Sequence, residues 1–256
     1  MSSQSVFVVD AGHTRIKCAL CHVESPRAVQ CQEFQAFDCP QDVDWNLLNT
    51  WEHPKLAILA GSNQSYVDAM ESMWPDVWPK PVRLQDNARV PIEILTDEPS
   101  QVGIDRLLNG VAVNAFRQDG HSAVIVDSGT AVTVDFVDET GAFRGGAILP
   151  GLRLSARALH EYTTTLPHVD IGVLGPIAVE PIGLNTDSAI LSGIHYGHIG
   201  AVKELVRRMG GDKTDIVLTG GAAPLLRREF PGARLDRSLS LQGLAITAIQ
   251  MRPSDG

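Results

Sequence analysis

Two short turns in this chain carry the residue types that an anionic ligand needs. The first turn runs from Asp10 to Lys17 and the second from Asp127 to Thr130, and each follows a β-branched run that predicts a strand. A glycine two positions after each aspartate lets backbone N–H groups approach phosphate closely. Both turns contain hydroxyl side chains, and an aspartate placed there can hold a cation that bridges to phosphate oxygens. We therefore predict phosphate contacts at both turns.

A third acidic residue and one lysine add to these candidates. Asp105 lies in the first turn of a strongly amphipathic helix predicted over 103–117. From its position alone it could instead be a carboxylate that interacts with the positive end of the helix dipole. Lys17 could neutralise a phosphate group or be an ordinary strand-end lysine. His195 and His198 could share one face of a predicted helix, but without a carboxylate as third ligand we interpret them as structural.

The elements that position the two turns repeat along the chain. Each turn joins a predicted strand to a returning strand, which together form a hairpin. Downstream of each hairpin, a buried run ends in small residues before a predicted helix, at 56–63 and again at 215–222. A single Asp-x-Gly turn is weak support, because that sequence most often forms only a turn. The repetition in the same order predicts an internal duplication, with domains at 1–118 and 119–256.

This duplicated pattern resembles the actin, sugar-kinase and Hsp70 superfamily. The resemblance implies an α/β fold with two tandem duplicated actin-like (ribonuclease H-like) domains and a nucleotide cleft between them. We also predict a strand over Val90 to Leu95 and a long helix over 185–209. That helix carries apolar residues on several sides and so needs several partners, from which we predict a homodimer.

The composition excludes several classes of protein. A net charge of −9 argues against nucleic-acid binding, which normally shows a basic surface. No apolar run approaches the roughly 20 residues that a membrane helix needs. The first residues lead directly into a predicted strand without the features of a signal peptide, so we expect a cytoplasmic protein. P-loop, GxGxxG and GxSxG motifs do not occur in the sequence, and their chemistries have no support.

The chain has four cysteines, of which Cys18 and Cys21 have the spacing of a zinc knuckle, with Cys31 and Cys39 downstream. Both of the first two fall on a predicted strand, where side chains three positions apart point to opposite faces. They could not chelate one ion without breaking the hairpin. We therefore expect reduced, structural thiols.

Seven sequence blocks resemble the signature blocks of type III pantothenate kinases, in order and at similar spacing over nearly the whole chain. These blocks are Asp10 to Lys17, Gly103 to Arg106, Asp127 to Ala131, Gly145 to Gly151, Thr165 to Pro167, Asn185 with Thr186, and Leu218 to Gly221. The resemblance implies ATP-dependent phosphorylation of pantothenate, the first committed step toward coenzyme A. Such a transfer needs positioning and charge neutralisation more than covalent help.

The resemblance also implies roles for individual residues. The first phosphate loop for ATP would comprise Asp10, Ala11, Gly12, His13, Thr14, Arg15, Ile16 and Lys17, with a further ATP contact from Thr130. Magnesium would accompany the nucleotide at Asp10, and Asp127 would hold an activating potassium or ammonium ion. Pantothenate would be bound by Gly103, Ile104, Asp105 and Arg106, with Asp105 as proton acceptor. Thr186 would line the pantothenate pocket at a homodimer interface.

Two positions depart from the family pattern. His13 stands where an asparagine is usual, and Thr96 stands where a pantothenate-contacting tyrosine is usual. Both departures concern binding, so we expect altered affinities rather than a loss of activity. Two alternatives stay open: a kinase for another small hydroxylated substrate, and a non-catalytic nucleotide-binding regulator. The intact Asp105 argues against the regulator.

Overall fold

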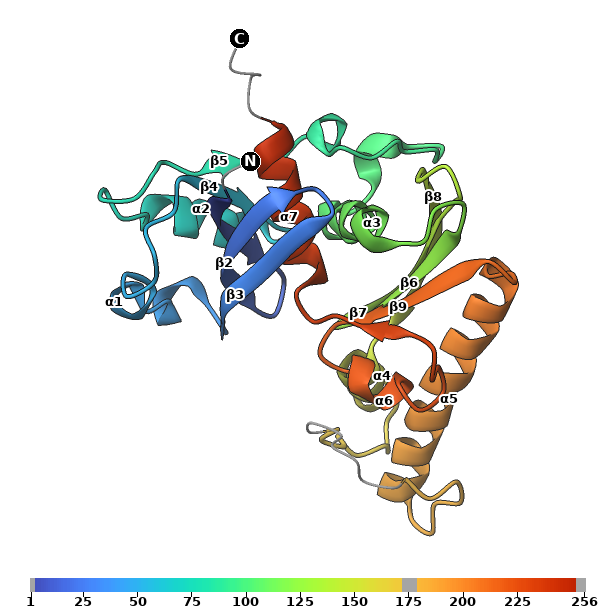
Figure 1. The fold of residues 1–256 in the computed structure, drawn as a ribbon. Helices are drawn as coiled ribbons and strands as arrows, with labels where there is room; N and C mark the ends of the chain where they lie inside the picture. The colour runs from blue at the N-terminus through green and yellow to red at the C-terminus, as the bar shows by residue number, and fades with distance from the viewer. Residues whose placement is uncertain (1–2, 172–178, 252–256) are drawn as a thin grey trace. The chain divides into compact units, whose positions relative to one another are not determined.

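A computed structural model describes residues 3–171 and 179–251 (Figure 1). The chain packs into two compact units. Unit 1 comprises Met1–Arg117, Gly141–Phe143 and Ser238–Gly256, and unit 2 comprises Gln118–Thr140 and Arg144–Arg237. The C-terminal segment thus belongs to unit 1, while the division into domains at 1–118 and 119–256 stays a prediction.

Unit 1 is built on a five-stranded mixed sheet in the order β3-β2-β1-β4-β5. Its strands are β1 (Gln4–Ala11), β2 (Ile16–Ser25), β3 (Ala28–Phe37), β4 (Leu56–Ala60) and β5 (Val82–Arg83). β1 pairs antiparallel with β2 and parallel with β4, so it lies at the centre. A central strand buried on both faces reads as a continuous apolar run, which explains the Val-Phe-Val-Val sequence of β1.

Helices cover both faces of this sheet. α1 (Trp45–Leu48) and α2 (Gln64–Ser72) contribute to the cluster around the odd-numbered residues of β1. The opposite face carries α7 (Leu239–Gln250), which packs against α3 (Ile104–Phe116). Helices α3 and α7 approach so closely that a Cβ at Gly243 would overlap the Leu108 carbonyl.

Unit 2 repeats this architecture with a sheet in the order β10-β9-β6-β7-β8. Its strands are β6 (Ser122–Ser128), β7 (Ala131–Val137), β8 (Phe143–Pro150), β9 (Thr214–Thr219) and β10 (Arg234–Leu235), and its helices are α4 (Leu152–Glu161), α5 (Thr186–Met209) and α6 (Ala223–Leu226). Here β6 pairs antiparallel with β7 and parallel with β9, as β1 does with β2 and β4. The α/β class and the duplicated strand order are therefore confirmed.

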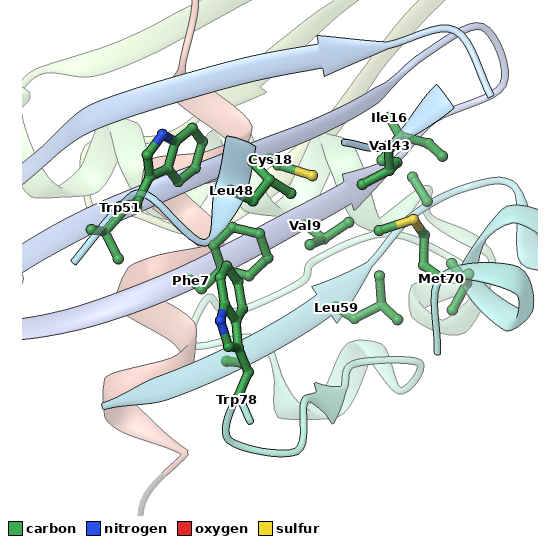
Figure 2. Packing of buried hydrophobic residues seen from close by; sticks show 14 residues of the cluster. Phe7, Val9, Ile16, Cys18, Val43, Leu48, Trp51, Leu59, Met70 and Trp78 are labelled. Carbon is green, nitrogen blue, oxygen red and sulfur yellow. The ribbon is translucent and has the colours of Figure 1, made fainter. Parts of the chain in front are cut away.

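The core of unit 1 is centred on Phe7, which Figure 2 shows among its apolar neighbours. Its ring lies 4.4 Å from that of Trp78, 5.7 Å from that of Trp74 and 6.1 Å from that of Trp51, as measured between ring centroids. Aromatic pairs at these separations add to the stabilisation that burial alone gives. Phe7 therefore joins β1 to the segments that carry the tryptophans.

Two sequence expectations are wrong. Val90 to Leu95 does not form a strand: only an isolated parallel bridge joins Ile94 to Phe143, and Pro91 cannot donate to a ladder. The expectation of reduced thiols fails for Cys21 and Cys31, which form a disulfide. They lie opposite each other in the antiparallel register of β2 and β3, a pairing that the comparison of Cys18 with Cys21 did not consider. Cys18 and Cys39 are free cysteines.

We predict that Phe7→Ala lowers the free energy of unfolding by about 3–5 kcal/mol, because it removes a fully buried ring and leaves a cavity. Urea unfolding followed by tryptophan fluorescence measures this, since all four tryptophans lie in unit 1. Phe34→Ala on β3, whose side chain is 44% exposed, is the control and should cost about 1 kcal/mol or less. Equal losses in the two variants would contradict this account of the core.

Candidate functional site

The first predicted phosphate loop is the tight connection between β1 and β2. Gly12 N donates to the Arg15 carbonyl at 3.0 Å and closes the turn. Asp10 and Lys17 face each other in the antiparallel register at its base. His13, Thr14 and Arg15 are exposed at its tip, and Arg15 Nε lies 3.6 Å from Asp38 Oδ1.

Asp10 differs from the tip because its side chain is buried. Ser240 Oγ of α7 donates to Asp10 Oδ2 at 2.8 Å, and Lys17 Nζ lies 3.7 Å from the same oxygen. The carboxylate is therefore held in one orientation by a hydroxyl and a cation. Sequence reasoning missed Ser240, which lies 230 residues along the chain and carries no motif of its own.

Cys18 lies beneath this loop and is fully buried. Burial raises the pKa of its thiol far above the ordinary value, and the negative charge of Asp10 raises it further. A thiol that stays protonated is a poor metal ligand, because metals bind the thiolate. Among the described residues, no group of three His, Cys, Asp or Glu side chains is arranged to hold a metal ion.

Asp105 lies in the first turn of α3, close behind the N-cap residue Gly103. Asp105 Oδ1 accepts a hydrogen bond from Arg106 N at 3.0 Å, and a Cβ at position 103 would come within 2.7 Å of that oxygen. Glycine at 103 is thus needed for this position of the carboxylate. The side chain is half-buried, which suits a group that contacts a ligand and also one that interacts with the helix dipole.

Arg106 and Thr96 both adjoin Phe143. The Arg106 guanidinium lies over the Phe143 ring, 5.5 Å from its centroid. Leu95 N donates to the Phe143 carbonyl at 2.9 Å, which brings the next residue, Thr96, close to the Phe143 backbone. Thr96 Oγ1 is buried and makes no hydrogen bond to any residue that the structure describes. A buried hydroxyl without a partner is costly and favours a role in ligand binding.

The second predicted phosphate turn joins β6 to β7. Gly129 N donates to the Ala131 carbonyl at 3.0 Å, and Gly151 N donates to the Thr130 carbonyl at 3.0 Å. Asp127 is half-buried beside Gly220, where a Cβ would come within 2.5 Å of Asp127 Oδ1. Gly220 also has a φ of +87°, so a side chain at this position would be both crowded and strained.

The two turns are held in the same way in their own units. Asn63 N donates to the Ala11 carbonyl at 3.1 Å, and Ala222 N donates to the Ser128 carbonyl at 2.9 Å. In each unit, a glycine two residues earlier packs directly against the end of the central strand. The duplication that the sequence predicts therefore extends to the backbone contacts that fix each turn.

A histidine that we interpreted as structural contacts the second turn. His198 Nε2 of α5 lies 3.2 Å from Ser128 Oγ, and Ser128 is fully buried. Burial lowers the pKa of His198 below its ordinary value of 6.5, and the neighbouring His195 lowers it further. The imidazole is therefore neutral at pH 7 and fixes the Ser128 hydroxyl. The i, i+3 spacing of His195 and His198 was visible in the sequence, but the contact of His198 with Ser128 was not.

Thr186 is the first residue of α5 and is exposed. The helix begins with a capping box in which Asn185 and Ser188 exchange hydrogen bonds between side chain and backbone. Thus Asp10 to Lys17, Thr96 and Gly103 to Arg106 lie in unit 1. Asp127, Thr130 and Thr186 lie in unit 2. No helix among residues 3–171 and 179–251 is long and apolar enough to cross a membrane.

Comparisons with known proteins give the family of the chain. A family model described as type III pantothenate kinase matches residues 6–208. Type III pantothenate kinase of Dehalococcoides mccartyi is 45% identical over 161 residues, which cover 60% of this chain and 59% of that protein. The Cereibacter sphaeroides enzyme of the same description is 40% identical over 162 residues, 62% of this chain and 61% of its own. The chain thus aligns with about three fifths of the length of these relatives.

One solved structure shares the fold over almost its whole length. It is described as a conserved putative Baf family transcriptional activator from Campylobacter jejuni, with a TM-score of 0.61 and 16% sequence identity. The match covers 95% of this chain and 98% of that one. At this identity the likeness shows the fold alone.

We predict that His198 makes the stability of the protein depend on pH. Because its pKa is lower in the folded than in the unfolded chain, the unfolded chain binds the proton more readily. Stability is therefore unaffected above pH 6.5 and falls as the pH falls from 6.5 to the folded pKa. Urea unfolding followed by circular dichroism between pH 5 and 8 measures the slope.

His198→Gln, which keeps a polar partner for Ser128, should flatten that slope. The matched control His168→Gln removes an imidazole outside the second turn and should leave the slope as in the wild type. A slope that survives in His198→Gln would contradict the assignment.

Proposed function

This chain belongs to the type III pantothenate kinase family, and we propose that it transfers the γ-phosphoryl group of ATP to the hydroxyl group of pantothenate. The products are 4′-phosphopantothenate and ADP. The observation that carries the proposal is the half-buried Asp105 carboxylate at the start of α3, next to Arg106 in sequence. A carboxylate there suits the general base that an alcohol acceptor needs.

In the proposed reaction, Asp105 accepts the proton of the pantothenate hydroxyl as its oxygen attacks the γ-phosphorus. The bond from that phosphorus to the bridging oxygen breaks, and ADP leaves with the electron pair. The backbone amides of His13 and Thr14 and the Lys17 ammonium neutralise phosphate charge. Thr130 adds a hydroxyl contact to ATP.

Asp10 suits a magnesium ion that accompanies the nucleotide. Mg²⁺ is usually bound by one or two carboxylates together with substrate phosphates, and a buried, oriented carboxylate at the base of a phosphate loop fits that donor set. The ion would neutralise charge on the phosphate oxygens when bound. Ser240 and Lys17 then keep the carboxylate in position.

Thr96 and Arg106 are proposed to contact pantothenate from unit 1, together with Gly103 and Ile104. The buried Thr96 hydroxyl lacks a hydrogen-bond partner among the described residues and can bond to the substrate. The same residue supports the second candidate, a kinase for another small hydroxylated substrate, because threonine replaces the larger tyrosine of the family pattern. His13 is exposed at the tip of the first loop and is expected to alter the affinity for ATP.

We also propose that the protein is a homodimer with Thr186 near the interface. Unit 2 exposes large apolar side chains: Leu184 is 92% exposed, Tyr162 is 85% exposed and Ile182 is 76% exposed. Ile182 and Leu184 lie within about four residues of Thr186 in the sequence, and exposed apolar side chains favour contact with a second copy. We place the enzyme in the cytoplasm with its substrate ATP, although a disulfide such as Cys21–Cys31 is unusual in that compartment.

We predict that Asp105→Asn lowers turnover by about 10²- to 10⁴-fold, because it removes the base and keeps the size of the side chain. The affinity for ATP should change little. Steady-state ADP release and calorimetric ATP binding measure the two quantities.

Asp44→Asn is the matched control, since Asp44 is the N-cap of α1 and the change removes the same charge at another helix start. It should leave turnover intact. If Asp105 served only the helix dipole, Asp105→Asn would cost about 0.3–1 kcal/mol of stability and keep its turnover. That outcome would remove Asp105 from the mechanism.

We predict that turnover requires potassium or ammonium through Asp127. The Asp127 carboxylate lies next to the backbone of Gly220, and carboxylate oxygens are ligands for hard cations. Asp127→Ala assayed in potassium should therefore resemble the wild type assayed in sodium. Wild-type enzyme that is equally active in sodium and potassium would refute the cation site.

We predict that Leu184→Asp weakens the dimer, since it places a charge in the proposed apolar contact. Sedimentation equilibrium over a dilution series should give a dimer for the wild type and a shift toward monomer for the variant. Val77→Asp, at a valine of unit 1 that is 70% exposed, should sediment like the wild type. A wild type that is monomeric at micromolar concentration would contradict the dimer.

A further inference from the structure

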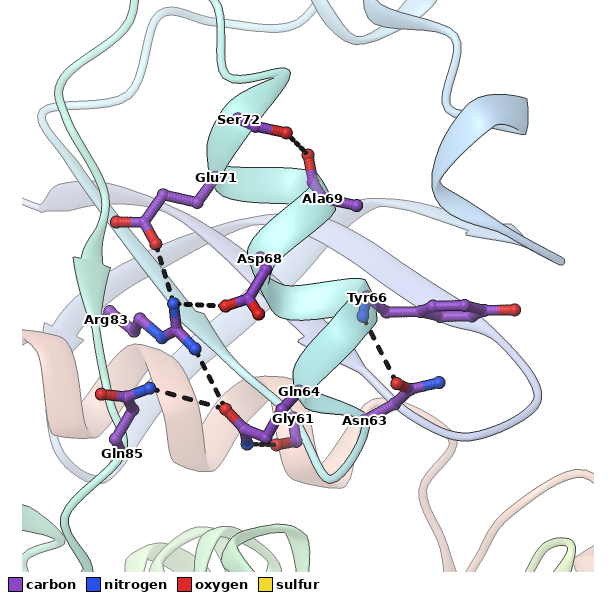
Figure 3. A network of polar contacts seen from close by, with 10 residues as sticks. All are labelled: Gly61, Asn63, Gln64, Tyr66, Asp68, Ala69, Glu71, Ser72, Arg83 and Gln85. Carbon is purple, nitrogen blue, oxygen red and sulfur yellow. Dashed lines mark hydrogen bonds and ion pairs between the residues drawn. The ribbon is translucent and has the colours of Figure 1, made fainter.

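The Gln64 side chain connects two parts of unit 1 that lie on either side of it (Figure 3). Its Nε2 donates to the Gly61 carbonyl at 3.1 Å, and its Oε1 accepts from Arg83 Nη2 at 3.1 Å. Gln64 is the first residue of α2, and Arg83 lies on the edge strand β5. Both ends of the amide are therefore fixed.

The Gly61 end of this connection adjoins the first phosphate loop. A Cβ at Gly61 would overlap the Ala11 carbonyl, and Asn63 N donates to that carbonyl at 3.1 Å. Ala11 is the last residue of β1 and directly precedes Gly12, whose amide closes the loop. The backbone at 61–63 therefore determines where the loop leaves β1.

The Arg83 end is anchored by charge. Arg83 Nη1 lies 2.6 Å from Asp68 Oδ1 and 3.0 Å from Glu71 Oε2, both on α2, and the arginine side chain is only 24% exposed. Hydrogen bonds between charged groups are stronger than neutral ones. Arg83 thus has a fixed guanidinium, and it presents its second nitrogen to Gln64 in one orientation.

We propose that Gln64, oriented by Arg83, is a positioning residue for the Asp10 to Lys17 loop and thereby for the phosphates of ATP. It acts through Gly61 and Ala11 and does not itself contact the ligand. The link to ATP rests on the proposed function. The link to the loop rests on the hydrogen bonds and on the close approach of Gly61 to Ala11.

The test compares Gln64→Met with Ser72→Ala, a control on the same helix. Methionine has a similar length and removes the hydrogen bonds of the amide to Gly61 and Arg83. Ser72→Ala removes a hydroxyl that bonds to the Ala69 carbonyl at the other end of α2 and leaves Gln64 and Arg83 unchanged. Hydrogen exchange of the peptide that contains residues 12–15 measures the loop directly, without any need for activity. Calorimetry with MgATP gives the dissociation constant.

In Gln64→Met we expect faster exchange at residues 12–15 and a roughly three- to tenfold rise in the dissociation constant for MgATP, the effect of one or two lost hydrogen bonds. Ser72→Ala should match the wild type in both. Equal exchange at residues 12–15 in the two variants would overturn the proposal. A wild type that binds no MgATP would refute the proposed function, while the exchange data would still decide the role of Gln64.

Gln64→Glu provides a second variant if Gln64→Met does not fold. The carboxylate keeps an acceptor for Arg83 but has no donor for the Gly61 carbonyl. Faster exchange at residues 12–15 is expected here too, because only the link to Gly61 is lost. Exchange at the wild-type rate in this variant would overturn the proposal.

Discussion

The structure depends on one close backbone contact that occurs in each unit. Where the central strand ends, the next parallel strand turns away through a glycine that packs directly on the strand end. Gly61 packs on Ala11 in unit 1, and Gly220 packs on Ser128 in unit 2. Since a Cβ at either glycine would collide with backbone, the contact requires glycine at both positions. The amide two residues later then donates to the strand-end carbonyl.

This contact explains why each of the two predicted phosphate turns has a defined position. The carbonyl group at the end of the central strand accepts a hydrogen bond from the connection between the next parallel strand and its helix. The turn that follows the central strand therefore starts from a fixed point. In unit 1 the turn also has the buried Asp10 at its base, bonded to Ser240 of α7. In unit 2 the Ser128 hydroxyl is bonded to His198 of α5. Helices distant in sequence thereby orient the polar groups of both turns.

Much of the fold could be predicted from local sequence. Both hairpins and the buried runs at 56–60 and 215–219 follow from β-branched and apolar patterns, and the start of α5 follows from its N-cap cluster around Asn185. The segment Val90 to Leu95 was mispredicted because its apolar composition suits a strand. Its Pro91 and the lack of a ladder beyond one bridge in the described part of the chain decide otherwise.

The candidate site was predictable where a motif carries it and not where a distant residue completes it. Asp10, Asp105 and Asp127 were visible because each occurs in a recognisable local pattern. Ser240, the Ser128 partner of His198, and the link from Gln64 to Arg83 join residues 230, 70 and 19 positions apart. The disulfide depended on the strand register, which places Cys21 opposite Cys31. Such pairings follow from the folded topology and have no local signal.

The most direct measurement of the central claim is ADP release by the wild-type protein in potassium buffer, with and without pantothenate. Product formation is followed in the same samples by ³¹P NMR. The account predicts that ADP release depends on pantothenate and is accompanied by an equal amount of a phosphomonoester of pantothenate. ADP release that is unchanged by pantothenate, or ATP binding with no transfer to it, would contradict the account.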